Sequence, residues 1–185
     1  MRLWILVVLS FGGGLAQAPS PAELLRAEAA TRRLSPADFS NLPAPLVDEL
    51  GRRACTVPQS QATTAPHNVV NGRFTSAAET DWAVLCSRGR ESVILVFRGG
   101  RPADVAELAS LPDANYFKFT AARELGFSRA LGVAGVPFLR ARMGRSLGPA
   151  PPPLDHDGLI DGFAGRSSIV WYWSGGHWLK LRADD

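Results

Sequence analysis

The chain has 185 residues, of which 46% are hydrophobic and 20% charged, a balance typical of a folded globular domain and not of a disordered chain. Its 20 Lys and Arg residues outnumber the 17 Asp and Glu residues, and the two signs are interleaved along the sequence. Because no basic run of the kind that follows a phosphate backbone is present, we expect no nucleic-acid partner.

The N-terminal residues have the pattern of a secretory signal peptide. Arg2 is followed by an apolar run at residues 3–9, and small residues stand at Ala16 and Ala18. The apolar run is too short to span a bilayer as a stable helix. We therefore expect an exported protein, periplasmic or secreted, with no membrane span after the signal peptide is removed.

The cleavage position has two candidates. Cleavage after Ala18 would leave Pro19 just past the scissile bond, and its ring and missing N–H hinder processing. We therefore favour residues 1–16 over residues 1–18 as the signal peptide. The mature chain, residues 17–185, has the length of one ordinary domain with a sizeable core.

Cys55 and Cys86 are the only cysteines of the chain. An even count in an oxidising compartment favours one disulfide. In the chain-entropy model, closing a loop of about thirty residues stabilises the fold by roughly 3–4 kcal/mol. The alternative is a reactive thiol, but no Cys-x-x-Cys pair exists and Cys86 ends an apolar, strand-like run that starts at Asp81. We predict a structural bridge.

Short helices are predicted ahead of Cys55. Residues 20–23, Ser-Pro-Ala-Glu, form a capping box with Pro at the first helical position, and residues 35–38, Ser-Pro-Ala-Asp, repeat a similar start. A short apolar stripe within residues 46–50 stops at Gly51. Each piece is too short to be stable alone, so we expect these helices to pack on a larger element.

That larger element is predicted to be a β-sheet. Residues 68–74, 81–87 and 92–97 are rich in Val, Leu, Ile, Phe and Trp, with turn residues between them. A three-residue connection at 88–90, with Gly able to take the left-handed position, predicts a hairpin. The third run is apolar almost throughout and predicts a central strand that is buried on both faces. Residues 103–109 fit either a short helix or an edge strand.

The C-terminal part predicts three further features. A short helix is expected from Pro137 to Gly144, followed by a Pro-rich extended connector at residues 148–153. A last hairpin joins residues 167–173 to residues 177–182 through Ser-Gly-Gly. The predicted fold is α+β: short N-terminal helices packed on an antiparallel β-meander, closed by a Trp-rich C-terminal hairpin.

Asp155, Asp157 and Asp161 form the only acidic constellation of the chain. Oxygen ligands at alternating positions near a Gly turn can hold a hard cation such as calcium, although the full ligand ladder of an EF-hand is missing. The alternative is a turn in which Asp157 caps a short helix that runs to Phe163. We favour the cap, because three carboxylates without further ligands bind calcium weakly, and we expect no other cofactor.

The three histidines, His67, His156 and His177, lie in no recognisable acid–base or metal motif. A triad of His67, Asp81 and a serine can be drawn, but the spacing alone gives it no support. His67 follows a proline and is expected to be a turn residue. We therefore predict no catalytic residue.

The aromatic residues Trp171, Trp173 and Trp178 are the best candidate for a binding surface. On a strand, Trp171 and Trp173 share one face while Tyr172 points to the other, and Trp178 can pair laterally across the Gly turn. Exposed, they would offer a platform for sugar rings or for a partner protein. Buried, they are core, which we favour because large aromatic side chains dominate core packing.

Residues 68–74, Asn-Val-Val-Asn-Gly-Arg-Phe, and residues 80–85, Thr-Asp-Trp-Ala-Val-Leu, resemble segments of uncharacterised exported bacterial proteins. They also resemble the strand–turn–strand unit of FG-GAP and VCBS-type β repeats. The acidic calcium loop of those repeats is replaced at residues 75–79 by Thr-Ser-Ala-Ala-Glu, so calcium binding does not carry over to this position. The resemblance implies a β-meander used as a scaffold or contact surface, and it implies no reaction.

The function that we expect from the sequence is that of a non-catalytic secreted or periplasmic protein that binds an envelope protein or a glycan. The alternative is a small periplasmic hydrolase or an inhibitor of one. A binding module predicts an exposed Trp171 or Trp173 and no concave pocket with paired titratable groups. An enzyme predicts a cleft that gathers His67 or His156 with a carboxylate.

Overall fold

The computed structural model describes residues 18–120, 122–143, 152–163 and 168–183 and has a mixed α+β architecture that is mostly β. Within these ranges, the paired strands run antiparallel to one another. The predicted fold class is thus confirmed at its coarse level. The predicted signal peptide and most of the predicted Pro-rich connector lie outside the described residues.

Three α-helices and three short 3-10 helices occur in the described ranges, namely α1 (Pro21–Ala30), α2 (Ala44–Arg52), α3 (Val136–Met143), η1 (Pro36–Asp38), η2 (Arg98–Gly100) and η3 (Asp113–Tyr116). The strands are β1 (Arg33–Leu34), β2 (Val57–Pro58), β3 (Val69–Gly72), β4 (Asp81–Arg88), β5 (Glu91–Phe97), β6 (Val105–Pro112), β7 (Phe117–Phe119), β8 (Leu125–Phe127), β9 (Arg129–Ala134), β10 (Gly158–Phe163), β11 (Ser168–Ser174) and β12 (His177–Ala183).

Helix α1 begins at the capping box that the sequence contains. The Ser20 hydroxyl accepts a hydrogen bond from the Glu23 amide, and the Glu23 carboxylate accepts one from the Ser20 amide. Ser35 and Asp38 make the same reciprocal pair at the start of η1. Both caps satisfy amide groups that the first turn of a helix leaves without a partner.

The first sheet is an up-and-down meander in the order β3-β4-β5-β6. Strand β5 is buried from Ser92 to Phe97, as expected for a central strand with apolar residues on both faces. The ambiguous segment at residues 103–109 contributes edge strand β6, whose pairing with β5 is interrupted by a register shift between Ser92 and Ile94.

The β4–β5 hairpin has a two-residue turn, which corrects the predicted three-residue connection. Arg88 pairs directly with Glu91, and the two turn residues, Gly89 and Arg90, have φ values of +57° and +68°. Positive φ at both central positions is the signature of a type I′ turn, whose twist matches that of the strands it joins.

The second sheet is another meander, in the order β12-β11-β10-β9. Strand β10 corrects the predicted helix after Asp157, because residues 158–163 pair with β9 on one side and β11 on the other. Successive side chains of β10 point to opposite faces: Leu159 joins the core between the sheets, and Ile160 joins the cluster around α3. Because β10 is a central strand that packs a side chain on each face, this segment forms a strand and not the predicted helix.

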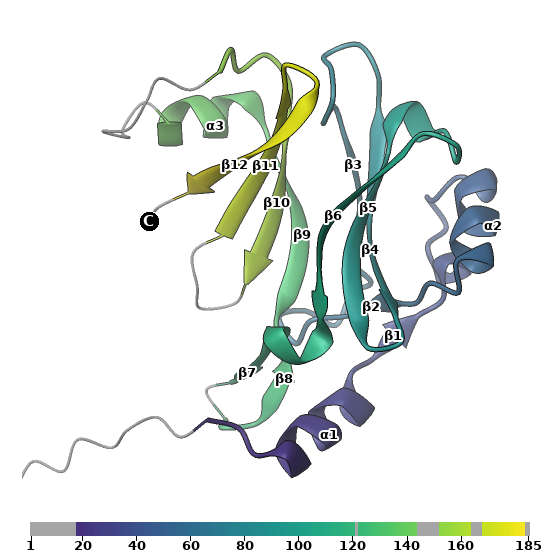
Figure 1. Ribbon diagram of the computed structural model, residues 1–185, viewed down its shortest axis with the longest axis vertical. Helices are drawn as coiled ribbons and strands as arrows, with labels where there is room; N and C mark the ends of the chain where they lie inside the picture. Colours follow the sequence, from purple (N-terminus) through teal and green to yellow (C-terminus); the bar gives the residue numbers. More distant parts are fainter. Residues whose placement is uncertain (1–17, 121, 144–151, 164–167, 184–185) are drawn as a thin grey trace, which may run out of the picture.

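The two sheets face each other across the main hydrophobic core, as Figure 1 shows. Helix α2 covers the outer face of the first sheet, where its leucines meet Cys86, Val93 and Leu95. Helix α3 covers the outer face of the second sheet through Leu139, against Tyr172. The chain is thus layered as helix, sheet, sheet and helix.

One side of this sandwich is closed by the side chain of Asn68. Its Oδ1 accepts a hydrogen bond from the Leu131 amide at 2.8 Å, and its Nδ2 donates to the Arg129 carbonyl at 3.3 Å. These bonds join the start of β3 to β9 as a neighbouring strand would. On the opposite side, β6 and β12 are both edge strands.

The predicted disulfide between Cys55 and Cys86 is present. It joins the segment after α2 to the middle of β4, within the cluster that α2 forms on the first sheet. Both cysteines are buried, and Cys86 is fully inaccessible. The bridge therefore fixes the N-terminal helical segment to the sheet.

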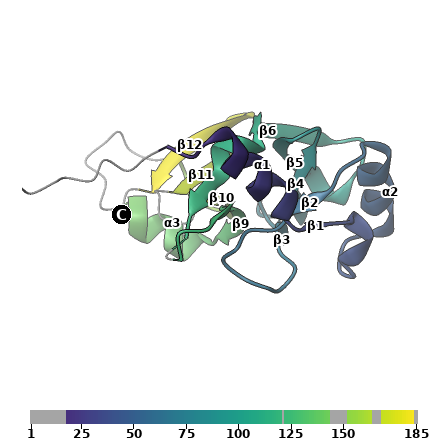
Figure 2. The same ribbon diagram turned by 90° about the horizontal axis from the view of Figure 1, so that it is seen from below.

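Helix α1 crosses the end of the sandwich at which the short β7–β8 hairpin lies, and Figure 2 shows this end from below. Ala27 and Leu24 of α1 pack on the core between the sheets.

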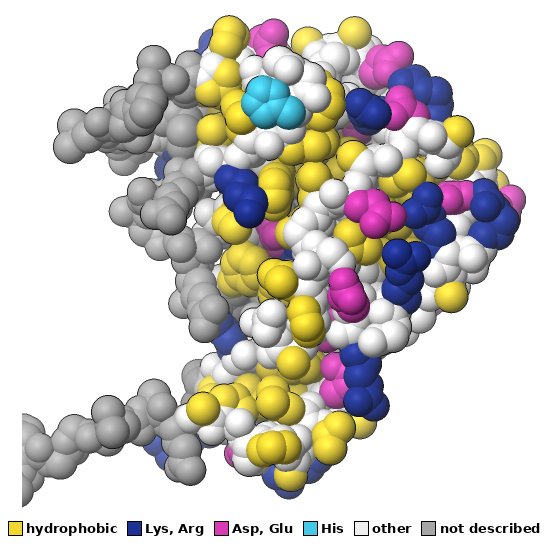
Figure 3. All heavy atoms as spheres, viewed as in Figure 1, with side chains coloured by type: hydrophobic (Ala, Val, Ile, Leu, Met, Phe, Trp, Pro, Cys, Tyr) yellow, Lys and Arg dark blue, Asp and Glu magenta, His cyan; other side chains and the backbone are white. Residues whose placement is uncertain are grey.

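On the face drawn in Figure 3, acidic and basic side chains lie interleaved over the β3–β6 sheet, while apolar side chains gather where the two sheets meet. Within the described ranges, every helix is too short or too polar to span a lipid bilayer.

Candidate functional site

A hollow on which several described segments converge lies beside α1, and we call it the α1 pocket. It has a volume of about 550 Å³, within the range of small-molecule sites. Its walls come from three segments that are distant in the sequence: the C-terminal end of α1 with Arg32, the loop after β2 within residues 59–64, and the β7–β8 hairpin at residues 120, 124, 126 and 127.

The loop after β2 is held at its ends by Gln59. The Gln59 side chain accepts the His67 amide at 2.8 Å and donates to the His67 carbonyl at 2.9 Å, so that it copies a strand pair. The same amide nitrogen donates to the Val57 carbonyl. The side-chain amide of Gln59 is therefore occupied in holding the loop. The residues between 60 and 66 face the pocket and solvent.

Ser60 and His67 form the one hydrogen bond between a serine and a histidine side chain among the described residues. His67 Nε2 lies 2.9 Å from Ser60 Oγ and also accepts the Ser60 backbone amide at 2.8 Å. Because an amide can only donate, Nε2 carries the lone pair, and the proton resides on Nδ1, 3.0 Å from the Ala65 carbonyl. The lone pair that a catalytic base needs is thus already engaged by a backbone amide.

Gln61 lies at the centre of the pocket rim. Its backbone amide donates to the Phe127 carbonyl at 3.1 Å. Its side chain rests on Gly126, in the space that a Cβ at residue 126 would occupy. In the described part of the chain, the Gln61 side-chain amide makes no hydrogen bond, so both its donor and its acceptor face the pocket without a partner.

The charged groups of the α1 pocket are of opposite sign. Arg32 donates to the Thr64 carbonyl at 2.9 Å and, among the described residues, pairs with no carboxylate. Glu124 is exposed and likewise makes no ion pair within the described ranges. Thr120 Oγ1 accepts the Glu124 amide, and its own hydroxyl proton has no acceptor among the described residues.

A smaller hollow adjoins the α1 pocket, and we call it the Phe119 hollow. Its volume is about 150 Å³, and Lys118, Phe119 and Ala62 contribute to its walls. Phe119 is 46% exposed. It offers an apolar face beside a pocket whose lining includes Arg32 and Glu124.

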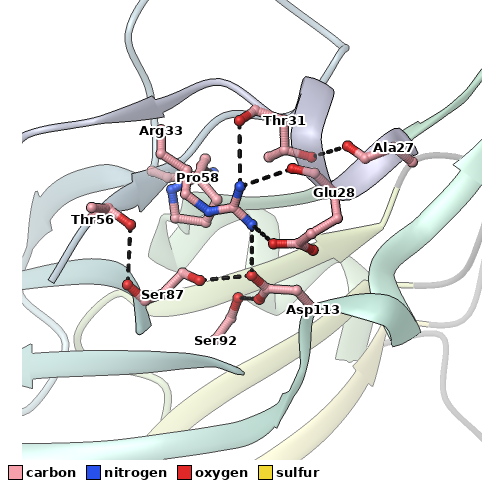
Figure 4. Close-up of polar contacts among 10 residues, drawn as sticks. Ala27, Glu28, Thr31, Arg33, Thr56, Pro58, Ser87, Ser92 and Asp113 are labelled. Atoms are coloured by element: carbon pink, nitrogen blue, oxygen red, sulfur yellow. Dashed lines mark hydrogen bonds and ion pairs between the residues drawn. The ribbon is translucent and has the colours of Figure 1, made fainter. Parts of the chain in front are cut away.

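A buried polar network connects α1 to the first sheet, as Figure 4 shows. The Asp113 carboxylate is fully buried and accepts hydrogen bonds from Ser87, from Ser92 and, at 3.0 Å, from the Arg33 guanidinium. Arg33 also pairs with Glu28 on α1. Since these groups satisfy one another, the network positions the helix and offers no free group to a ligand.

The three carboxylates considered for calcium do not converge. Asp161 is buried in a bidentate pair with Arg129, at 2.8 and 2.9 Å. Asp157 accepts the Arg73 backbone amide, and the Asp155 Oδ1 atom lies 3.3 Å from the Tyr172 hydroxyl. Within the described ranges, no three acidic, His or Cys side chains are grouped to hold a metal ion.

The tryptophans lie at the core between the sheets and at its margin. Trp171 is only 7% exposed and belongs to the core, with Lys180 over its ring. Trp173 and Trp178 are half-buried and pack edge to face, 5.5 Å apart, and the Arg98 guanidinium covers Trp173. The rings are thus engaged by the protein itself and form no flat open platform.

His156 and Asp81 have local structural roles. His156 stacks on Tyr172 and contacts the Trp173 carbonyl through Nε2 at 3.0 Å. Asp81 accepts hydrogen bonds from Thr75 and from the Gly99 amide. The Asp81 oxygens are thus used within the turns around β4, and His67 takes a backbone carbonyl as its second partner.

Sequence reasoning found none of the residues that make the α1 pocket. Arg32, Gln61 and Glu124 lie in loops or next to turns and belong to no motif. One signal was present: Gly126 interrupts an apolar strand, and an isolated glycine in a strand marks a close approach of another group. The identity of that group, Gln61, follows only from the fold.

The chain matches no protein-family model, no curated protein and no solved structure with which it was compared. Its function is therefore inferred from the geometry of the site.

Proposed function

We propose that the mature chain is a non-catalytic exported protein that binds a glycan, and that the α1 pocket holds it. The observation that carries the proposal is a set of polar groups without partners around one cavity. The Gln61 amide, the Glu124 carboxylate and most of the Arg32 guanidinium are unused by the described chain.

The chemistry of these groups suits sugar hydroxyls. A hydroxyl both donates and accepts, so it can bind to an amide, which does the same, or bridge a carboxylate and a guanidinium. Thr120 adds a further hydroxyl. Hydrogen bonds to charged groups contribute about 1.5–3 kcal/mol each, so a few such contacts provide useful affinity for a small neutral ligand.

The hydrolase alternative has one feature in its favour, the Ser60–His67 contact. Against it stands the engagement of His67 Nε2 by the Ser60 amide and the absence of a carboxylate partner for His67 among the described residues. A fluorophosphonate probe separates the two functions. We expect no labelling of the purified protein, whereas labelling that is lost in Ser60→Ala would establish the hydrolase.

The cysteine bridge agrees with export, because disulfides form and persist in oxidising compartments. The predicted signal peptide at residues 1–16 supports the same localisation, periplasmic or secreted. An exported domain of this kind meets the glycans of the envelope or of the surroundings directly.

The proposal is tested by calorimetric titration with neutral tetrasaccharides of glucose, of xylose and of N-acetylglucosamine. We expect at least one of them to bind, and Arg32→Gln and Glu124→Gln each to weaken that binding about tenfold or more, since each loses a charge-assisted hydrogen bond.

The matched control is Arg26→Gln, which removes an exposed arginine of α1 that does not line the pocket. It should bind as the unaltered protein does. Binding of no saccharide, or equal affinity in all three variants, would overturn the proposal.

A further inference from the structure

The α1 pocket and the Phe119 hollow are parts of one groove. Both are lined by Gln61, Thr120, Gly126 and Phe127, so they meet around the Gln61 side chain. The hollow, at about 150 Å³, is smaller than an ordinary ligand site, whereas the pocket, at about 550 Å³, is of ordinary size. The hollow is therefore an extension of the pocket and not a site of its own.

Gln61 is held at the junction by Gly126. The side-chain amide lies where a Cβ on residue 126 would be, so only glycine leaves room for it. The Gln61 backbone is fixed at the same place by its hydrogen bond to the Phe127 carbonyl. A side chain that can both donate and accept thus stands between the two parts of the groove, unbonded among the described residues.

The two parts differ in chemistry. The α1 pocket presents Arg32, Glu124 and the Thr120 hydroxyl. The Phe119 hollow shares Thr120 with the pocket and adds Lys118 and a half-exposed aromatic ring next to Ala62. A polar lining suits the edge of a sugar ring, where the hydroxyls point outward, and an aromatic ring suits the apolar face of a sugar.

We infer that the groove selects an elongated glycan of at least two sugar units, an inference that rests on the proposed function. One unit lies in the α1 pocket. The next passes Gln61, which bonds to both units or to the linkage between them, and stacks on Phe119. Phe119 and Gln61 are then the residues that determine selectivity for chain length.

The first experiment compares the mono-, di- and tetrasaccharide of whichever series binds in calorimetric titration. We expect the disaccharide to bind about tenfold more tightly than the monosaccharide, the gain that one additional stacked ring provides. Phe119→Ala should remove most of this gain and affect the monosaccharide little. The control Phe138→Ala removes an aromatic ring of similar exposure on α3 and should leave the gain intact.

The second experiment uses Gln61→Ala, Gly126→Ala and the double variant. Gly126→Ala should fold normally, because the Cβ meets only the flexible end of Gln61, but it displaces that side chain from the junction. Each single variant should lose the chain-length gain to the same extent, and the double variant should lose no more than either. Thermal unfolding of each variant verifies the fold.

The outcomes separate this inference from the proposed function. Equal affinities for mono- and disaccharide, or a gain that survives Phe119→Ala and Gln61→Ala, would overturn the elongated-ligand inference while leaving glycan binding in place. Additive losses in the Gln61 and Gly126 variants would overturn the role of Gln61 at the junction. Absence of any saccharide binding would overturn both proposals.

Discussion

Tyr116 is a buried residue whose acidity is changed by the fold. Its ring lies in the core between the sheets, stacked on Phe163 and covered by the Arg129 guanidinium at 4.4 Å. Its hydroxyl is buried and has no hydrogen-bond partner among the described residues. Burial raises the pKa of Tyr116 to about 12, because the ionised form would lose its hydration.

This pKa predicts how stability depends on pH. The unfolded tyrosine ionises at about pH 10, whereas native Tyr116 keeps its proton to about pH 12. Between these values the unfolded state binds fewer protons, so the free energy of unfolding falls as the pH rises, by roughly 2–3 kcal/mol in all. Urea unfolding at several pH values, with Tyr116→Phe as the comparison, measures this contribution.

At neutral pH, Tyr116→Phe should be neutral or stabilising by about 1 kcal/mol, since it removes an unpaired buried hydroxyl. The matched control is Tyr172→Phe. The Tyr172 hydroxyl donates to the Pro153 carbonyl at 2.8 Å and accepts the Asp155 amide, so its removal should destabilise by about 1 kcal/mol. A clear destabilisation by Tyr116→Phe would contradict the assignment of its hydroxyl as unpaired.

At the scale of the elements, the turn between β4 and β5 contains a local strain. Gly89 adopts its positive φ without cost, but Arg90, at φ +68°, has a side chain that disfavours this region. The Arg90 carbonyl accepts the Asp113 amide at 2.8 Å, so the turn also supports the start of η3. The strained conformation of Arg90 therefore occurs in a hairpin that also positions the start of η3.

Arg90→Gly should stabilise the protein by about 1 kcal/mol, because glycine adopts positive φ freely and keeps the carbonyl. The reciprocal change, Gly89→Ala, should destabilise by a similar amount, although a Cβ there would meet no other atom. Urea midpoints of the two variants measure both effects. Destabilisation by Arg90→Gly would mean that the Arg90 side chain contributes more than its backbone conformation costs.

The elements themselves differ in how far sequence predicts them. The capping boxes at Ser20 and Ser35 specify local hydrogen bonds and mark the starts of α1 and η1. The apolar run from Ser92 to Phe97 predicts a central strand and β5 is one. The helix expected after Asp157 is wrong, because a Gly-bounded segment of mixed polarity has no periodicity of its own and adopts the strand that β9 and β11 impose.

At the scale of the whole molecule, Arg129 connects the two sheets. It is fully buried on β9, pairs with Asp161 on β10, and reaches the Ser92 and Ala109 carbonyls on the opposite sheet at 3.4 and 3.2 Å. Ser92 in turn donates to Asp113, which binds Arg33. A chain of polar contacts therefore crosses the interior from β10 to the segment after α1.

Arg129→Met should destabilise the protein by about 3–5 kcal/mol, because it leaves the Asp161 charge buried without compensation. The double variant Arg129→Met with Asp161→Leu should recover most of that loss, since apolar pairs of similar volume often replace buried ion pairs at little cost. Chemical denaturation measures both.

The matched control is Arg101→Met, which breaks the exposed pairs of Arg101 with Glu79 and Asp104 and should destabilise far less, because exposed ion pairs are screened by solvent. A loss in the Arg129 variant no larger than in this control would show that Asp161 finds another partner when the guanidinium is removed.

The amino-acid sequence alone determined the local features and one covalent constraint: the helix caps, the apolar strands and the pairing of the only two cysteines, each of which depends on neighbouring residues or on simple counting. The tertiary structure determined which residues meet at the sites and which are buried. Arg32, Gln61 and Glu124 meet because three segments are packed on one end of the sandwich, and Tyr116 and Trp171 are buried because the sheets close over them. Contacts between residues far apart in the chain arise from packing as a whole, so no local pattern contains them.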